Sequence, residues 1–197
     1  MQMLSYKELY NACQQCTKCA LANGRTNLVF GEGNIKADIM FVGEGPGHDE
    51  DMQGRPFVGR AGQLLTKMIE AINLKREDVY IANIVKCRPP NNRVPYPEEA
   101  QACLPYLRNQ YAIIRPSIIV CLGATAGRYI LSSNLRITRD RGIWTVRNGC
   151  HMIATYHPAA LLRDTDKKKD AWEDLKKVRD KYNELISDKH KCDTANS

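Results

Sequence analysis

Short apolar runs alternate with amphipathic segments along this chain, and the alternation predicts an α/β fold. Buried strands are expected at three apolar runs, 39–42, 78–85 and 117–122. Apolar residues three and four positions apart follow the first and third runs, at 61–72 and 124–131, as in helices that pack one face on a core. Strands that alternate with helices build an open sheet with helices against it.

The remaining segments continue this pattern. Pro97, followed by two glutamates, opens a helix well, because proline fits the first turn and acids favour the positive end of the helix dipole. Segment 142–155 predicts two strands joined by an Asn-Gly dipeptide, which is typical of tight hairpins. Helices are also expected over 5–13 and, with an apolar stripe, over 168–186.

The chain of 197 residues is long enough for one domain with a substantial core. We predict a single domain over 1–187 that includes the cysteine-rich start of the chain. The apolar stripe ends near Ser187, so 188–197 is expected to form a flexible C-terminal tail.

The first strand runs into a glycine-rich loop, Gly-Glu-Gly-Pro-Gly at 43–47, before its helix. Such a loop lies at the carboxyl edge of the sheet, where open α/β folds bind ligands. The glycines let a ligand approach the backbone, while Glu44, three acids at 49–51 and Phe57 bring carboxylates and a ring to the same place. A solvated surface loop does not explain the aromatic residue. We therefore interpret this loop as an active site.

Two polar residues follow other strands at the same edge. Asn83 lies late in the second strand, and its amide offers both a donor and an acceptor, which suits the edge of a nucleobase. His157 follows the last strand and precedes Pro158, which can start a short helix. A lone histidine at such a place is more often structural than functional.

The net charge of +7 is concentrated in the middle of the chain. Segment 86–147 holds ten basic residues, nine of them arginine, against three acids. Because guanidinium groups bind phosphate in a planar fork, this distribution favours a nucleic-acid partner over a generally basic surface. No apolar run approaches the ~20 residues that span a bilayer, and the first residues lack a signal-peptide pattern, so we expect an intracellular protein without membrane association.

Eight cysteines in an intracellular protein indicate a metal or catalysis before disulfides. Cys13, Cys16 and Cys19 share a CxxCxxC spacing that can present several thiolates to one centre, as in ferredoxin-type clusters. No second CxxC closes a zinc site, and the available partners are Cys87 and Cys103. Five candidates compete for four positions, so one thiol is surplus.

The chain resembles the iron–sulfur uracil-DNA glycosylases of family 4, which are common in archaea and thermophilic bacteria. The resemblance extends from Cys16 to about Trp172 and rests on an ordered set of motifs. These are Cys-x-x-Cys-x-Leu with Gly24-Arg25-Thr26, then 29–33, 42–47, 54–59, 83–90 and 157–159. It implies a three-layer αβα sandwich around a mostly parallel, four-stranded sheet.

The resemblance also implies a [4Fe–4S] cluster held by Cys16, Cys19, Cys87 and Cys103. The Cys-x-Leu pattern fits Cys19, which makes Cys13 the surplus thiol. The cluster is expected to have a structural role remote from the chemistry.

It further implies a DNA repair glycosylase that flips uracil out of the helix and binds it in a pocket. Gly43 and Gly45 are expected to line this pocket. Phe57 would stack on the uracil face, and the Asn83 amide would pair with its edge and so exclude cytosine.

Hydrolysis of the N-glycosidic bond would release free uracil and leave an abasic site, which begins base excision repair. His157 would stabilise the charge that develops on uracil O2, and Glu44 would hold the attacking water. Asp49, Glu50 and Asp51 are alternatives for the water. No lysine beside the loop is placed for lyase chemistry, so we expect a monofunctional enzyme.

DNA contacts are expected on two segments. Leu161 and Leu162 are candidate wedges into the gap that the flipped base leaves, and Arg163 would grip phosphates. Arg88 and Arg93 belong to a stiff basic loop with the same expected role.

Two other functions fit parts of the pattern: a non-catalytic iron–sulfur DNA-binding module, and a zinc-stabilised α/β hydrolase or transferase acting on a nucleotide. Neither needs Phe57, Asn83 and His157 together. The expected partner is uracil-containing DNA, single- or double-stranded, bound by a monomer associated with the nucleoid. A sliding clamp or another repair protein is a candidate partner, although neither terminus shows a clear clamp-binding pattern.

Overall fold

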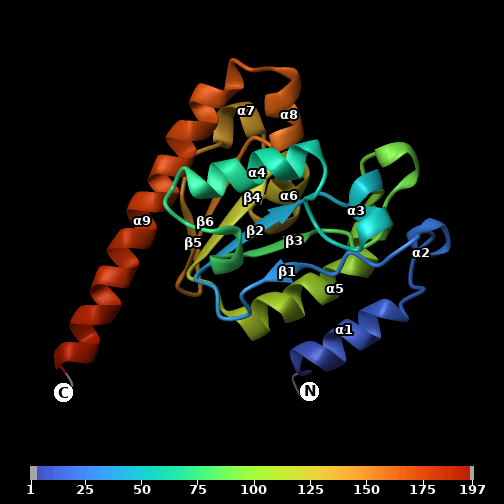
Figure 1. Ribbon diagram of the computed structural model, residues 1–197, viewed down its shortest axis with the longest axis horizontal. Coiled ribbons are helices and arrows are strands. Elements are labelled where there is room, and N and C mark those ends of the chain that lie inside the picture. Colours follow the sequence, from blue (N-terminus) through green and yellow to red (C-terminus); the bar gives the residue numbers. More distant parts are fainter. Residues whose placement is uncertain (1–3, 196–197) are drawn as a thin grey trace.

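The computed structural model describes residues 4–195, with side chains described through Asp188. A single mixed sheet runs through the centre, with strand order β1-β3-β2-β4-β6-β5 (Figure 1). The strands are β1 (Glu32–Gly33), β2 (Ile39–Gly43), β3 (Tyr80–Asn83), β4 (Ile118–Leu122), β5 (Thr145–Arg147) and β6 (Cys150–Thr155).

Four of these strands, β3, β2, β4 and β6, are parallel neighbours. Every residue of β2, β3 and β4 is buried, as expected where helices cover both faces of a parallel sheet. The short strands β1 and β5 add antiparallel edges, so the expected count of four strands is wrong and the sheet has six. With two and three residues, these edge strands are too short to produce a clear periodic pattern.

The predicted hairpin forms between β5 and β6. Its turn residues Asn148 and Gly149 both have positive φ, 49° and 77°, which is the conformation that favours an Asn-Gly pair.

Helices cover both faces of the sheet. They are α1 (Tyr6–Gln14), α2 (Leu21–Gly24), α3 (His48–Gln53), α4 (Arg60–Glu70), α5 (Pro97–Ile114), α6 (Gly123–Ile130), α7 (Ile137–Asp140), α8 (Pro158–Arg163) and α9 (Lys167–Ala195), with 3-10 turns η1 (Arg76–Asp78) and η2 (Pro90–Asn92).

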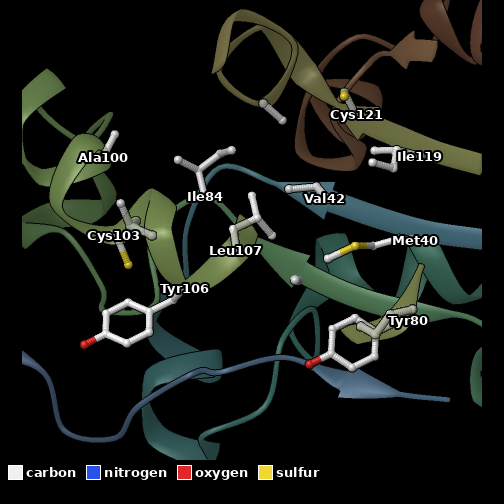
Figure 2. Close-up of a cluster of buried hydrophobic side chains, with 14 of the residues drawn as sticks. Met40, Val42, Tyr80, Ile84, Ala100, Cys103, Tyr106, Leu107, Ile119 and Cys121 are labelled. Carbon is white, nitrogen blue, oxygen red and sulfur yellow. The ribbon is translucent and has the colours of Figure 1, made fainter. Parts of the chain in front are cut away.

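Side chains of β2 alternate between two cores, because successive residues of a strand point to opposite faces. Met40 and Val42 join the core formed with α1, α5 and α6, part of which is shown in Figure 2. Ile39 and Phe41 join the core formed with α4, α8 and α9. This arrangement confirms the predicted αβα sandwich.

Helix α9 is the longest element, with 29 residues, and it extends beyond the body of the molecule (Figure 1). Its backbone stays helical past Ser187, where the sequence predicted the regular structure to end; no glycine or proline interrupts it. Residues 196–197 of the predicted tail lie outside the described part of the chain, and the flexibility of 188–195 stays a prediction. No helix among the described residues is both long and apolar enough to cross a membrane.

Candidate active site and cysteine cavity

The glycine loop and Asn83 meet at the carboxyl ends of two neighbouring strands. Gly43 ends β2 and is the register partner of Asn83, which ends β3. A Cβ atom on Gly43 would lie 2.5 Å from both Asn83 Oδ1 and Phe57 Cζ. Glycine is therefore required for the amide and the ring to approach the loop this closely.

Phe57 is held in an unusual backbone conformation, with φ of 52° and only 6% exposure. A bulky residue at positive φ persists only where its surroundings fix it. Gly62 in α4 leaves room for this conformation, because a Cβ there would lie 1.9 Å from the Phe57 carbonyl carbon. The Phe57 ring lies 5.6 Å from the His157 ring at an interplanar angle of 33°. Phe57 and His157 thus belong to one site.

His157 caps the N-terminus of α8, and its Nδ1 accepts a hydrogen bond from the Ala159 N–H at 3.1 Å. In a neutral ring with this bond, the proton lies on Nε2, which is then a donor. Burial, and then the charge of Arg163, lowers the pKa of His157 to about 4. At neutral pH the ring is therefore an uncharged donor.

Asn83 is buried, with 1% exposure, and in the described part of the chain its Oδ1 has no hydrogen-bond partner. An unpaired buried acceptor costs about 1–3 kcal/mol, so such an atom needs a physical reason. A ligand N–H that donates to Asn83 Oδ1 would provide this reason.

The four acids of the loop differ in what they contact. Glu44 accepts a hydrogen bond from the Thr125 hydroxyl at the start of α6. Glu50 accepts from two N–H groups just before α4, each at 2.9 Å, and from one in the glycine loop at 3.1 Å, so it braces the loop. Asp51 is buried and accepts from the N-terminal segment at 2.9 Å, while Asp49 has a side chain that is 57% exposed. Glu50 and Asp51 thus accept hydrogen bonds from backbone N–H groups, whereas Glu44 accepts one from a side chain.

The two leucines of α8 lie in different surroundings. Leu161 is 2% exposed and packs in the core beneath the site. Leu162 is 39% exposed, and Arg163 beside it is exposed as well. Of the two leucines, therefore, only Leu162 lies at the surface, and Leu161 packs in the core.

The basic loop after β3 is partly held by internal contacts. Arg93 makes two hydrogen bonds to Glu99, at 2.8 and 2.7 Å, and its guanidinium lies 3.7 Å from the centre of the Tyr96 ring. Arg88 donates to Asn92 at 2.8 Å. Arg93 thus has a structural partner that the sequence prediction overlooked, although Glu99 lies only six positions further on.

All five candidate thiols line one cavity. Its walls are formed by Cys13, Cys16, Lys18, Cys19, Ala22, Arg25, Leu28, Lys86, Cys87, Ala102, Cys103 and Tyr106. Figure 2 shows the Cys103 sulfur beside the Tyr106 ring.

Positive side chains accompany these thiols. Arg25 Nη1 donates to Cys87 Sγ at 3.3 Å. Burial raises the pKa of Cys13 to about 12 and that of Cys103 to about 11, so a thiolate forms there only where a positive centre compensates the buried charge. The lysine in the cavity wall, Lys86, has 0% exposure. Sequence reasoning missed its role; a lysine directly after an apolar strand was the available indication.

Comparison with known proteins agrees with this geometry. A family model described as the uracil DNA glycosylase superfamily matches residues 30–176. A type-4 uracil-DNA glycosylase of Thermotoga maritima is 49% identical over 172 residues, or 84% of this chain and 88% of the relative. Its counterparts are 46% identical over 184 residues in Archaeoglobus fulgidus (89% and 92%) and 48% over 187 residues in Sulfurisphaera tokodaii (90% and 85%). The chain therefore belongs to the type-4 uracil-DNA glycosylases of the uracil DNA glycosylase superfamily, which confirms the resemblance seen in its motifs.

Proposed function

We propose that this protein removes uracil from DNA by hydrolysing the N-glycosidic bond, which leaves an abasic site for base excision repair. The observation that carries the proposal is the buried, unpaired Oδ1 of Asn83 next to the Phe57 ring. Uracil presents an N3–H donor beside its O4 acceptor, so one amide binds both. Cytosine presents the opposite pattern and would leave buried groups unpaired.

The flipped base would lie against Phe57, with Gly43 and Gly45 allowing its close approach. The position of His157 at 5.6 Å from that ring supports a role for its Nε2–H at uracil O2. Because the ring is neutral, it stabilises the departing anion by donating a hydrogen bond, without prior protonation.

Glu44 would hold the attacking water and support positive charge on the sugar. The Thr125 hydroxyl fixes one carboxylate oxygen, which leaves the other available to a water molecule. Water, and not a lysine, is the proposed nucleophile, so the enzyme would release the base without cutting the strand.

The cysteine cavity fits an iron–sulfur cluster by its donor set, since five thiols and three basic side chains form its walls. Cys16, Cys19, Cys87 and Cys103 would hold a [4Fe–4S] cluster, with Cys13 as the surplus thiol. Bound there, the cluster would tie the N-terminal segment to α5 and to the loop after β3, with no redox step in base release.

DNA would meet the site through Leu162 as wedge and through Arg163 and Arg88 at phosphates, with Arg93 and Leu161 supporting these segments from within. We propose that the protein acts inside the cell, near the nucleoid, as a monomer. A sliding clamp or another repair protein stays a candidate partner.

The test is uracil release from matched oligonucleotides that carry one U or one T, followed by alkali to cleave abasic sites. We expect cleavage of the U strand only, only after alkali, and loss of cleavage in Asn83→Ala. Asn134→Ala, a change of an exposed asparagine, serves as the matched control. No release from any U strand by folded, iron-loaded protein would refute the enzyme and favour the non-catalytic DNA-binding module.

A further inference from the structure

A buried lysine, Lys86, lies between the proposed base pocket and the cysteine cavity, and a chain of polar groups holds it. Lys86 Nζ donates to the backbone carbonyl of Asn83 at 2.9 Å and to Gln110 Oε1 at 2.6 Å. Gln110 is also fully buried and donates to Tyr80 OH at 3.0 Å, which bonds Tyr6 OH at 2.9 Å. Each contact is of ordinary hydrogen-bond length, so the chain is continuous.

The end of the sheet explains why Asn83 needs this lysine. Strand β1 pairs only with Tyr80 and Ile81, and the Ile81 carbonyl faces the β1 side. Backbone carbonyls of a strand point to the same side at every second residue, so the Asn83 carbonyl faces the same side as the Ile81 carbonyl. It lies beyond the last residue of β3 that pairs with β1. Lys86 supplies the missing donor from within the core.

The charge on Lys86 is unusual in its setting. A fully buried ammonium is costly unless opposite charge compensates it. Burial lowers the pKa of Lys86 to about 8, and the nearby sulfurs of Cys103 and Cys13 offset only part of this effect. Lys86 therefore bonds the pocket on one side and faces the cluster ligands on the other.

We propose that Lys86 is a positioning residue for uracil recognition, which holds the main chain of Asn83 so that the amide points at the base. Lys86 also lines the cysteine cavity, so the cavity and the pocket share one anchor. The inference rests on the proposed role of Asn83 in binding the uracil edge.

The test is a double-mutant cycle of Lys86→Met and Asn83→Ala, measured by single-turnover uracil excision with enzyme in excess. Lys86→Met removes the hydrogen bond to the Asn83 carbonyl and lets the Asn83 amide shift. We expect excision to be slower by about tenfold to a hundredfold in this variant. In the Asn83→Ala background the same change should cost less than about twofold, because the group that Lys86 positions is absent.

Two controls separate positioning from general destabilisation. Tyr80→Phe removes the hydroxyl that Gln110 contacts on the side away from Lys86 and leaves the bond from Lys86 to Asn83 in place, so excision should stay within about twofold of wild type. Lys86→Gln retains a neutral donor and should recover part of the lost rate; it replaces Lys86→Met in the cycle if the latter does not fold. Iron release to a chelator should be faster from Lys86→Met than from Tyr80→Phe.

Each outcome is decisive. A full, multiplicative loss in the Asn83→Ala background would overturn the positioning role, and equal iron release from both variants would overturn the shared anchor. An unchanged rate in Asn83→Ala alone would instead refute base recognition by Asn83, and the inference with it. Three results together would support the proposal: a smaller loss of rate from Lys86→Met in the Asn83→Ala background than in wild type, partial recovery of the rate in Lys86→Gln, and faster iron release from Lys86→Met.

Discussion

Gly43→Ala is the smallest change that disturbs the proposed pocket. The new methyl group would lie 2.5 Å from Asn83 Oδ1 and 2.5 Å from Phe57 Cζ. Ordinary van der Waals contact begins near 3.4 Å. The amide or the ring must therefore retreat by about 1 Å, because β2 is buried on both faces and has little room to move.

A displacement of about 1 Å in a recognition group can cost about a hundredfold in rate. We expect Gly43→Ala to slow single-turnover uracil excision by about that factor, with a loss of about 1–3 kcal/mol in the free energy of unfolding from overpacking. Affinity for undamaged DNA should be unchanged, since the methyl group does not reach the exposed surface. Excision rates, urea unfolding and a DNA-binding titration measure the three quantities.

Gly24→Ala is the matched control, because a Cβ at Gly24 has no atom within 4 Å and the backbone there has negative φ. Its excision rate should equal that of wild type. A wild-type rate in folded Gly43→Ala would refute the reasoning, because it would mean that neither Asn83 nor Phe57 needs its present position for base release.

Three further predictions concern α8, the cysteine cavity and His157. Leu162→Ala should slow excision from duplex DNA by about tenfold relative to single strands, with a free energy of unfolding within about 0.5 kcal/mol of wild type. Leu161→Ala should lower the free energy of unfolding by about 2–5 kcal/mol. The reverse ranking would contradict the wedge assignment. Cys13→Ser should keep wild-type iron content and Cys16→Ser should lose it, and equal iron in both would show that Cys13 is not surplus. The pKa of His157 is lowered to about 4 in the folded protein, against about 6.5 in the unfolded chain. Between these pH values the unfolded state binds a proton that the folded state does not, so the protein loses stability as the pH falls from 6.5 toward 4. Between pH 6.5 and 4 the free energy of unfolding, measured with urea, should therefore fall by up to about 3 kcal/mol more in wild type than in His157→Gln. If the free energies of the two proteins fall in parallel with pH, the ring is not buried in its neutral form.

The sequence predicted that Gly43, Asn83 and His157 lie at one edge of the sheet because of how a parallel sheet is built. Gly43, Asn83 and His157 each follow an apolar run, and the carboxyl ends of parallel strands meet at one edge. That argument needs only strand positions and directions, which apolar runs indicate. It does not need side-chain contacts.

Other features depend on contacts that a one-dimensional pattern does not contain. Leu161 and Leu162 are identical in type, and only the way α8 packs on the core separates them. Arg93 was expected at phosphates, whereas its orientation in the fold pairs it with Glu99. The edge strands β1 and β5 have only two and three residues, too few to show an alternation of apolar and polar positions in the sequence. They form because their backbones pair with β3 and β6.

The segment after β3 explains how the proposed cluster could affect base release from a distance. Asn83, Lys86 and Cys87 lie within five positions, so one short stretch supplies the amide proposed to read the base, the lysine that bonds its main chain and a cavity thiol. On the neighbouring strand, the Gly43 and Glu44 carbonyls accept from the N–H groups of residues 84 and 85, at 2.9 and 3.1 Å. A constraint applied at Cys87 therefore acts on both strands that form the floor of the pocket. A ligand set on this stretch would stabilise the pocket geometry without taking part in bond cleavage, which is the role that hydrolysis by water leaves for it.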